Sequence, residues 1–176
     1  MNYATIKERD IANGPGVRVS LFVSGCTHRC KGCFNEVAWD FGYGEPFTQD
    51  TIDRILELLA PGFVRGLTLL GGEPFEPQNQ GALVELLRQV KERYPEKSVW
   101  AFSGYLFDRD ILPCRLGDPA VTRELIGYLD VLVDGPFVES RKDLSLRFRG
   151  SDNQRLIDVR ASLEAGEVVL WKDWQD

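Results

Sequence analysis

Short apolar runs alternate with amphipathic stretches along most of this chain, and this alternation constrains its fold more than any other feature. Four runs have the composition of buried strands. Between them, apolar residues recur at helical spacing after the N-cap candidate Thr48, from Gln80 to Tyr94 and from Val121 to Leu129. Alternating strands and helices favour a parallel sheet with helical crossovers. The expected strands are Val17 to Ser24, Gly66 to Leu70, Ser98 to Phe102 and Val131 to Val133.

Two architectures fit this order of elements, an open doubly wound sheet and an incomplete relative of the barrel of alternating strands and helices. A complete eight-fold barrel needs about 250 residues, and this chain has 176. We expect a single domain over residues 1–176, with a core of about 14–155 and a C-terminal extension, 156–176. In that extension, RLIDV and EVVLW flank Ala165 and Gly166, which predicts a hairpin.

Composition and charge exclude several classes of protein. The net charge of −6 argues against a protein that binds nucleic acid, because such a protein needs a basic face. No apolar run approaches the roughly 18 residues of a membrane span, and the polar start MNYATIKERD does not look like a secretory leader. Four cysteines are too few for a disulfide framework, so we expect a protein of the reducing cytoplasm.

Three cysteines stand close together in the run GCTHRCKGC, directly after the first expected strand. Their spacing lets the sulfurs of Cys26, Cys30 and Cys33 converge on one centre, and clustered thiolates of this kind hold iron–sulfur clusters. Structural zinc takes four protein ligands, so a zinc site would need His28 as the fourth. The sequence favours a cluster with one open iron, and leaves His28 as a loop or partner-contact residue and Cys114 as a structural thiol.

A glycine pair and an acid follow the second expected strand, in Gly71-Gly72-Glu73-Pro74. Glycines let the backbone approach a bound cofactor closely, and a carboxylate such as Glu73 can orient an ammonium group through a charge-assisted hydrogen bond. The same residues could form an ordinary turn. Because the cysteine run, this motif, Ser103-Gly104 and Asp134-Gly135 each follow a strand, we expect all four at one edge of the sheet.

The order of these motifs carries a family resemblance. The spacing CxxxCxxC after a strand, with Phe34 after the last cysteine and Gly71 to Pro74 after the next strand, resembles the radical S-adenosylmethionine superfamily. The resemblance implies an α/β fold of the incomplete (β/α) barrel type with parallel strands and the cluster loop after the first strand. It also implies that Cys26, Cys30 and Cys33 ligate a 4Fe-4S cluster whose fourth iron binds S-adenosylmethionine.

A narrower resemblance covers most of the chain up to Arg155. The segments NGPG, GCxHxCxGCxN, DVLVDGPFV and FRGSDNQR resemble the family that activates anaerobic ribonucleotide reductases. It implies an enzyme that cleaves S-adenosylmethionine reductively and uses the 5′-deoxyadenosyl radical to form a glycyl radical on an anaerobic ribonucleoside-triphosphate reductase. A flavodoxin or ferredoxin would supply the electron. The chemistry belongs to the cluster and cofactor, so no catalytic side chain is expected.

The sequence also offers candidate contacts with the partner and the cofactor. Asn13 is a candidate partner contact, the basic side chains of Arg147, Arg149 and Arg155 are candidates for a docking face, and Trp171 and Trp174 are candidates because aromatic residues are enriched at protein interfaces. The cofactor contacts come from the resemblance. The implied cofactor contacts are Gly32, Cys33 and Phe34 at the adenine, Gly71, Gly72 and Glu73 at the methionine end, and Ser103 and Asp134 at the ribose or carboxylate.

Two other functions compete with this interpretation. One is an activator of another glycyl-radical enzyme of the pyruvate formate-lyase type, against which the GSDNQ segment speaks. The other is a metal-binding or electron-transfer module without a reaction of its own, which would need a fourth ligand for its cluster.

Overall fold

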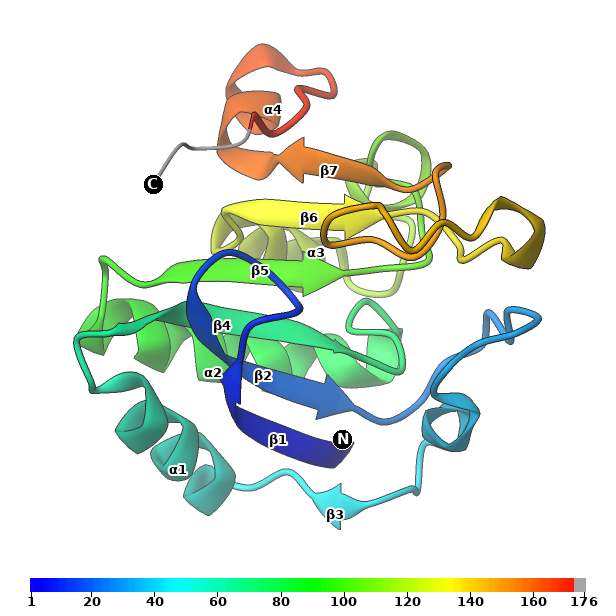
Figure 1. Cartoon of the computed structure of the whole chain (residues 1–176). Helices are drawn as coiled ribbons and strands as arrows, with labels where there is room; N and C mark the ends of the chain where they lie inside the picture. Colours follow the sequence, from blue (N-terminus) through cyan, green and yellow to red (C-terminus); the bar gives the residue numbers. More distant parts are fainter. Residues whose placement is uncertain (173–176) are drawn as a thin grey trace.

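The computed structural model describes residues 1–172, and within them seven strands form one sheet (Figure 1). The strands are β1 (Asn2–Asp10), β2 (Val17–Val23), β3 (Glu45–Pro46), β4 (Val64–Gly71), β5 (Ser98–Phe102), β6 (Val131–Asp134) and β7 (Arg155–Asp158). Their order across the sheet is β3-β1-β2-β4-β5-β6-β7. The central strands β2, β4, β5 and β6 are parallel, whereas β1, β3 and β7 pair antiparallel with their neighbours.

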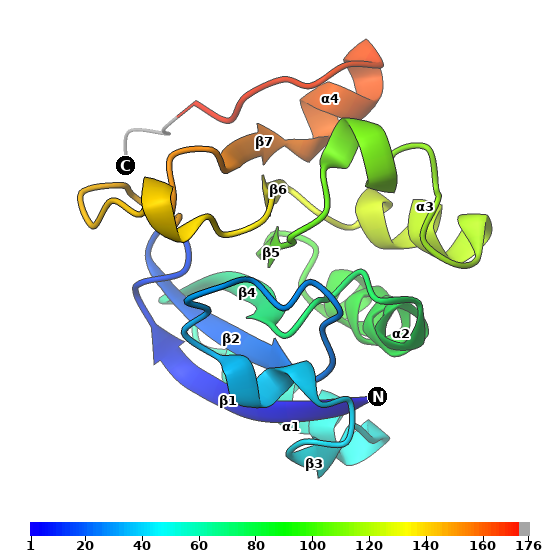
Figure 2. The same cartoon turned by 90° about the vertical axis from the view of Figure 1, so that its right-hand side faces the viewer.

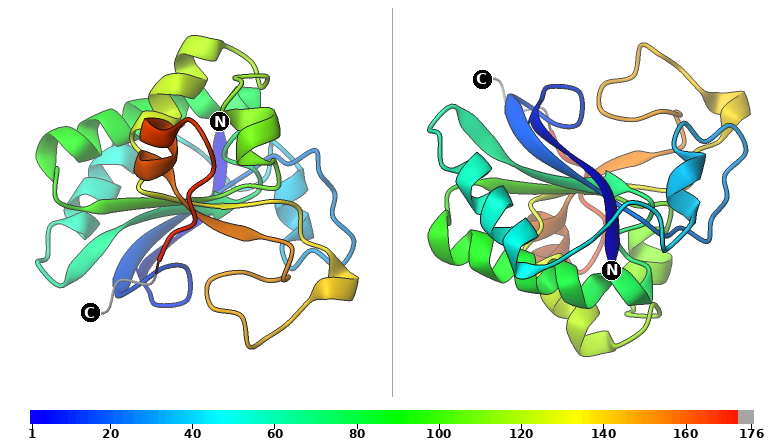
Figure 3. Two further views of the ribbon diagram at one scale, coloured as in Figure 1. Left: turned by 90° about the horizontal axis from the view of Figure 1, so that it is seen from above. Right: turned by 90° about the horizontal axis from the view of Figure 1, so that it is seen from below.

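The main helices lie on one face of this sheet. Figure 3 shows α1, α2 and α3 together on that face, while the loop of residues 11–16 and the segment 137–153 lie on the other. The helices are α1 (Gln49–Leu59), α2 (Pro77–Arg93), α3 (Pro119–Gly127) and α4 (Val159–Ala165), with shorter turns η1 (Glu36–Trp39), η2 (Phe107–Ile111) and η3 (Glu139–Arg141).

The starts of α1 and α2 and the buried faces of these helices follow from their sequences. A capping box formed by Thr48 and Thr51 begins α1. The apolar stripe of this helix, which includes Ile52 and Ile55, is buried. Proline at the first turn of α2 lacks only an N–H that would have no helical partner there. The apolar faces of α1 and α2 pack against β2, β4 and β5 in one core. This packing holds the ends of these strands in place.

The α/β class and the predicted order of strands and helices are confirmed, but three features were not predicted. Strand β1 precedes the expected first strand, so the cysteine run follows the second strand of the chain. Two of the three antiparallel strands, β1 and β3, lie outside every predicted element. The predicted hairpin is wrong, because α4 lies between the two segments. Gly166, with φ +71°, ends α4 as a left-handed C-cap, although Ile157 and Leu170 still form one antiparallel bridge.

The carboxyl ends of the four parallel strands point to the same edge of the molecule, which faces the viewer in Figure 2. The cysteine loop, the glycine pair and the residues after β5 and β6 all start there, as predicted. Across residues 1–172, no helix has both the length and the apolar character needed to cross a bilayer.

Candidate functional site

The cysteine run forms a loop that folds back on the segment after it. The N–H of Gly25 donates to the carbonyl of Ala38 at 2.8 Å, and the N–H of Cys26 donates to that of Trp39 at 3.2 Å. Gly25 has φ +97°, and a Cβ there would lie 2.2 Å from the ring of Phe41. Only glycine fits this position, so the loop leaves β2 in a fixed direction.

All three cysteines of the loop are reduced and half-buried. Burial raises the pKa of Cys26 to about 11 and also raises that of Cys30. Both are therefore thiols at neutral pH, and binding of iron would release their protons. The N–H of Asn35 donates to the sulfur of Cys33 at 3.4 Å, the kind of contact that tunes a cluster thiolate.

The donor set fits an iron–sulfur cluster better than a single ion. Within residues 1–172, no three or more His, Cys, Asp or Glu side chains are gathered around one point as a metal-ion site. Structural zinc takes four protein ligands, whereas three clustered thiolates can hold a 4Fe-4S cluster with one open iron. His28, the extra ligand of the zinc alternative, is engaged elsewhere.

Glu73 lies beside the cysteine loop, fully buried at the end of β4. Its Oε1 accepts hydrogen bonds from the N–H of Phe75 and the hydroxyl of Ser103, both at 2.9 Å. Its Oε2 accepts from the N–H of Gly104 and lies within hydrogen-bonding distance of His28 Nε2, both at 2.8 Å. A carboxylate has about four acceptor positions, so Glu73 is saturated.

The glycine pair before Glu73 brings two strand ends together. The N–H of Gly72 donates to Val23, and the N–H of Glu73 donates to Gly25 at 2.8 Å. A Cβ on Gly72 would lie 2.6 Å from the Gly25 carbonyl oxygen, and Gly71 has φ +107°. The pair is thus required for close approach of the backbone of β4 to the cysteine loop.

His28 occupies a more central place than the sequence indicates. Its ring contacts Glu73 and lies edge-on to Tyr105, with ring centroids 4.3 Å apart. Burial opposes a charged imidazole, but the hydrogen bond and the charge of Glu73 outweigh it, so the pKa of His28 is raised. The fold brings His28 and Glu73 together from distant positions in the chain, and no local signal in the sequence pairs them.

A second carboxylate, Glu76, ties the cysteine loop to α2 and was not singled out from the sequence. Its Oε1 accepts from the N–H of Thr27 at 2.7 Å and from the hydroxyl of Thr27 at 2.6 Å. Asn79 donates from its side chain to the carbonyls of Ser24 and Glu73, both at 3.0 Å. The acid and amide spacing in GGEPFEPQN was the available signal.

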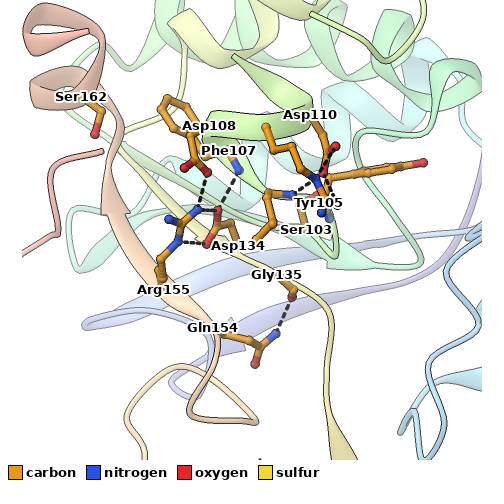
Figure 4. A network of polar contacts seen from close by, with 12 residues as sticks. Ser103, Tyr105, Phe107, Asp108, Asp110, Asp134, Gly135, Gln154, Arg155 and Ser162 are labelled. Atoms are coloured by element: carbon orange, nitrogen blue, oxygen red, sulfur yellow. Dashed lines mark hydrogen bonds and ion pairs between the residues drawn. The ribbon is translucent and has the colours of Figure 1, made fainter. Parts of the chain in front are cut away.

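The remaining predicted cofactor contacts lie in different environments. Ser103 reaches Glu73, whereas Phe34 is 84% exposed and Gly32 lies against Glu139 of η3. Asp134 is fully buried and bonds to the N–H of Phe107 at 2.7 Å and to the guanidinium of Arg155 at 2.6 and 3.0 Å (Figure 4). Both oxygens of Asp134 are therefore occupied within the protein.

The predicted partner contacts lie on the face of the sheet opposite the helices. The loop of residues 11–17 and residues 146–148 line one hollow of about 510 Å³. Arg147 and Arg149 line a second, of about 380 Å³. Asn13 donates to Asp10 at 2.6 Å. Trp171 packs against Trp100 and Phe148, whereas Trp174 lies outside the described residues.

Comparison with known proteins agrees with this site. Residues 12–157 match the family described as "4Fe-4S single cluster domain". That range includes the cysteine loop, Glu73 and the ends of all four parallel strands, and it supports an iron–sulfur cluster at Cys26, Cys30 and Cys33.

Relatives with known names cover most of the chain. A protein of Enterobacteria phage T4 is 42% identical over 156 residues, which cover 89% of this chain and 93% of its own length. Proteins of Vibrio cholerae and Escherichia coli strain K12 are 41% and 39% identical, cover 88% and 91% of this chain, and are matched over 96% and 100% of their own lengths. All three are named "Anaerobic ribonucleoside-triphosphate reductase-activating protein".

Proposed function

Because this chain belongs to the family of anaerobic ribonucleoside-triphosphate reductase-activating proteins, we propose that it generates a glycyl radical on such a reductase. Cys26, Cys30 and Cys33 would hold a 4Fe-4S cluster, which would supply one electron for reductive cleavage of S-adenosylmethionine to methionine and a 5′-deoxyadenosyl radical, and that radical would take a hydrogen atom from a glycine of the reductase. The electron comes from a flavodoxin or ferredoxin in the cytoplasm.

One observation carries this proposal: three reduced thiols on a single loop lie next to a buried carboxylate. Cys26, Cys30 and Cys33 leave one iron of a cubane without a protein ligand. Glu73 supplies the anionic acceptor that a ligand with an ammonium group requires. A module that only carries electrons has no use for an open iron or for such an acceptor.

We assign the other contacts by position. Gly71 and Gly72 let the backbone approach the methionine end of the cofactor, and Gly32, Cys33 and Phe34 face its adenine. Ser103 contributes at the ribose or carboxylate, and Asp134 acts there through the 103–107 loop that it holds by the N–H of Phe107. In this proposal the parallel centre of the sheet is the incomplete barrel of radical S-adenosylmethionine enzymes.

The partner reductase binds on the face that carries the loop of residues 11–17 and the segment 142–149. Asn13, Arg147 and Arg149 are the proposed contacts, and exposed leucine and isoleucine side chains, Leu144 and Ile11, lie on the same two segments. Basic side chains on an otherwise acidic chain favour an acidic surface of the partner.

Reductive cleavage tests the proposal. Protein reconstituted anaerobically with iron and sulfide, then reduced with dithionite, should release methionine and 5′-deoxyadenosine from S-adenosylmethionine. Addition of the reductase should give a glycyl-radical doublet in the electron paramagnetic resonance spectrum. A doublet on a pyruvate formate-lyase but not on the reductase would contradict the assigned partner, and absence of cleavage would contradict the activity.

Single cysteine variants provide the matched control. Replacement of Cys26, Cys30 or Cys33 by serine should abolish the cluster, measured as bound iron and sulfide. Cys114→Ser should retain it, because Cys114 is buried and its thiol bonds to the carbonyl of Leu112 rather than to this loop. Loss of iron from Cys114→Ser would show that the cluster has four protein ligands and no open iron.

A further inference from the structure

All hydrogen-bond acceptor positions of Glu73, the carboxylate proposed to bind the ligand, are already occupied in the free protein. Glu73 is fully buried, and each of its oxygens is bonded to two groups. This step rests on the proposed function, in which an ammonium group binds at Glu73. Since a carboxylate has about four acceptor positions, an incoming ammonium must replace one of the four present partners.

Three of these partners are held in place. The N–H groups of Phe75 and Gly104 belong to the backbone and cannot leave without a change of the chain path. The hydroxyl of Ser103 is fixed at both ends, because it donates to Glu73 and accepts from the N–H of Tyr105 at 3.1 Å. Displacing any of them would leave a buried polar group without a partner.

His28 is held less firmly than these three. It contacts Glu73 through the end of a side chain, 17% of which is exposed, whereas Ser103 is buried. Its neighbour Arg29 has φ 50°, a left-handed conformation that costs energy for a residue other than glycine. Rotation of the His28 side chain toward solvent would leave the other three hydrogen bonds intact, and water would then satisfy the imidazole.

The residues around the imidazole of His28 leave space for it without holding it by further hydrogen bonds to the backbone of Gly104 or to Tyr105. Gly104 leaves room for it, because a Cβ at that position would lie 2.6 Å from the His28 ring. Tyr105 contacts the ring edge-on on another side. Since Glu73 can only accept, Nε2 of His28 is the donor in this contact, the same role that an ammonium N–H would have.

We propose that His28 is a placeholder for the ammonium group of the ligand: its Nε2–H occupies Oε2 of Glu73 in the free protein and leaves when the ammonium binds there. The site is thereby kept fully hydrogen-bonded and closed to water before the ligand arrives. His28 is a positioning residue that competes with the ligand and is not itself a ligand contact.

A spectroscopic test needs no variant, because His28 is the only histidine of the chain. Protein labelled with ¹⁵N in histidine alone, and loaded anaerobically with its cluster, should show a protected Nε2–H signal. Saturation with S-adenosylmethionine should remove that signal by exchange with water, whereas 5′-deoxyadenosine, which lacks the ammonium, should leave it. A signal that persists with S-adenosylmethionine would overturn the proposal.

Binding measurements test the competition itself. By equilibrium dialysis, the His28→Ala variant should bind S-adenosylmethionine about tenfold more tightly than the unchanged protein, since one hydrogen bond to a charged group no longer opposes the ligand. His28→Gln keeps an N–H donor and should bind as the unchanged protein does. Lys31→Ala, an exposed change in the same loop, is the control and should have no effect.

The outcomes separate this proposal from the proposed function. Equal or weaker binding by His28→Ala, with normal binding by the unchanged protein, would overturn only the placeholder role. If the unchanged, cluster-loaded protein binds no S-adenosylmethionine, the proposed function fails and the placeholder role fails with it. If His28→Ala does not hold a cluster, the histidine signal of the unchanged protein still decides.

Discussion

Two fully buried charges, Arg18 on β2 and Glu73 after β4, are stabilised by different kinds of partner. Arg18 donates to the hydroxyls of Thr68 and Ser98 at 2.8 and 2.9 Å, and to the carbonyls of Leu67 and Ser98 at 2.9 and 3.0 Å. Among the described residues, no carboxylate lies within ion-pair distance of it. Burial lowers its pKa to about 10, so it stays charged at neutral pH.

The partners of Arg18 all belong to the sheet, and the loop of residues 11–16 closes over them. A Cβ on Gly14 would lie 2.7 Å from the Arg18 side chain, and Thr68 donates onward to the carbonyl of Asn13 at 2.8 Å. The four partners of Glu73, in contrast, all lie on loops, and His28 contacts it through a partly exposed side chain. Arg18 makes four hydrogen bonds to the sheet and Glu73 accepts four, but only Glu73 has a partner that can leave, which is what a ligand site requires and a structural site avoids.

Replacement of Arg18 should destabilise the fold strongly. Arg18→Ala should lower the free energy of unfolding by about 3–5 kcal/mol, because it leaves a cavity and removes the donor from four acceptors that are buried or partly buried. Urea denaturation would measure it. Arg54→Ala, an exposed arginine of α1 paired with Glu8, is the matched control and should change stability by about 0–1 kcal/mol. Equal effects would show that Arg18 is not structural.

Asp134 is a third fully buried charge, and its partner Arg155 is also charged. Asp134→Asn should cost about 3 kcal/mol, because Arg155 and the N–H of Phe107 would share one remaining acceptor oxygen. The fall should appear in denaturant unfolding with the slope m unchanged. Since Asp134 holds the 103–107 loop, the same variant should also weaken binding of S-adenosylmethionine. A stability loss without weaker binding would confine Asp134 to the fold.

Glu73→Gln should affect both the stability of the fold and the binding of the ligand. The amide offers a donor where the N–H groups of Gly104 and His28 also donate, so we expect a loss of about 2 kcal/mol in stability. Binding of S-adenosylmethionine should weaken about 10- to 100-fold, as a charge-assisted hydrogen bond is lost. Glu85→Gln, exposed on α2, should change neither quantity. Unchanged binding by Glu73→Gln would remove the ligand role of Glu73.

Local features of this chain can be predicted from its sequence alone, whereas contacts between distant residues cannot. Cys26, Cys30 and Cys33 were found because their spacing is local, and the central strands because a buried run is apolar throughout. β1 was missed, since only Tyr3 and Ile6 of its apolar residues are buried and its other positions are mostly charged or polar. It is a strand because β2 and β3 pair with it, which is information that its own residues do not contain.

Non-local contacts explain the remaining differences. Nothing in the sequence pairs His28 with Glu73 or places Arg18 under Gly14, because each contact depends on the order of strands in the sheet. α4 was misread for a local reason. Its run VRASLEA is short, and its helical signals are the N-cap Asp158, which accepts from Ala161, and the C-cap Gly166. In the sequence, Gly166 is equally typical of a hairpin turn.

Asp108 is a half-exposed carboxylate, and its replacement tests whether burial determines how much an ion pair stabilises the fold. It shares Arg155 with Asp134, at 2.7 Å, but half of its side chain is exposed. The hydrogen bond from Arg155 lowers the pKa of Asp108 below its ordinary value. Since the folded pKa is below the unfolded one, this stabilisation is present above about pH 4 and is lost as the pH falls through the folded pKa.

Asp108→Asn should therefore cost only about 0.5 kcal/mol at pH 7, as an exposed ion pair does. The difference from the unchanged protein should shrink as the pH falls toward 3, measured by urea denaturation at each pH. Asp134→Asn at pH 7 is the matched comparison, because it breaks the other contact of the same guanidinium. If Asp108→Asn and Asp134→Asn lower the free energy of unfolding equally, exposure does not determine the strength of these contacts. The distinction between Arg18 and Glu73 would then depend only on which partner can move.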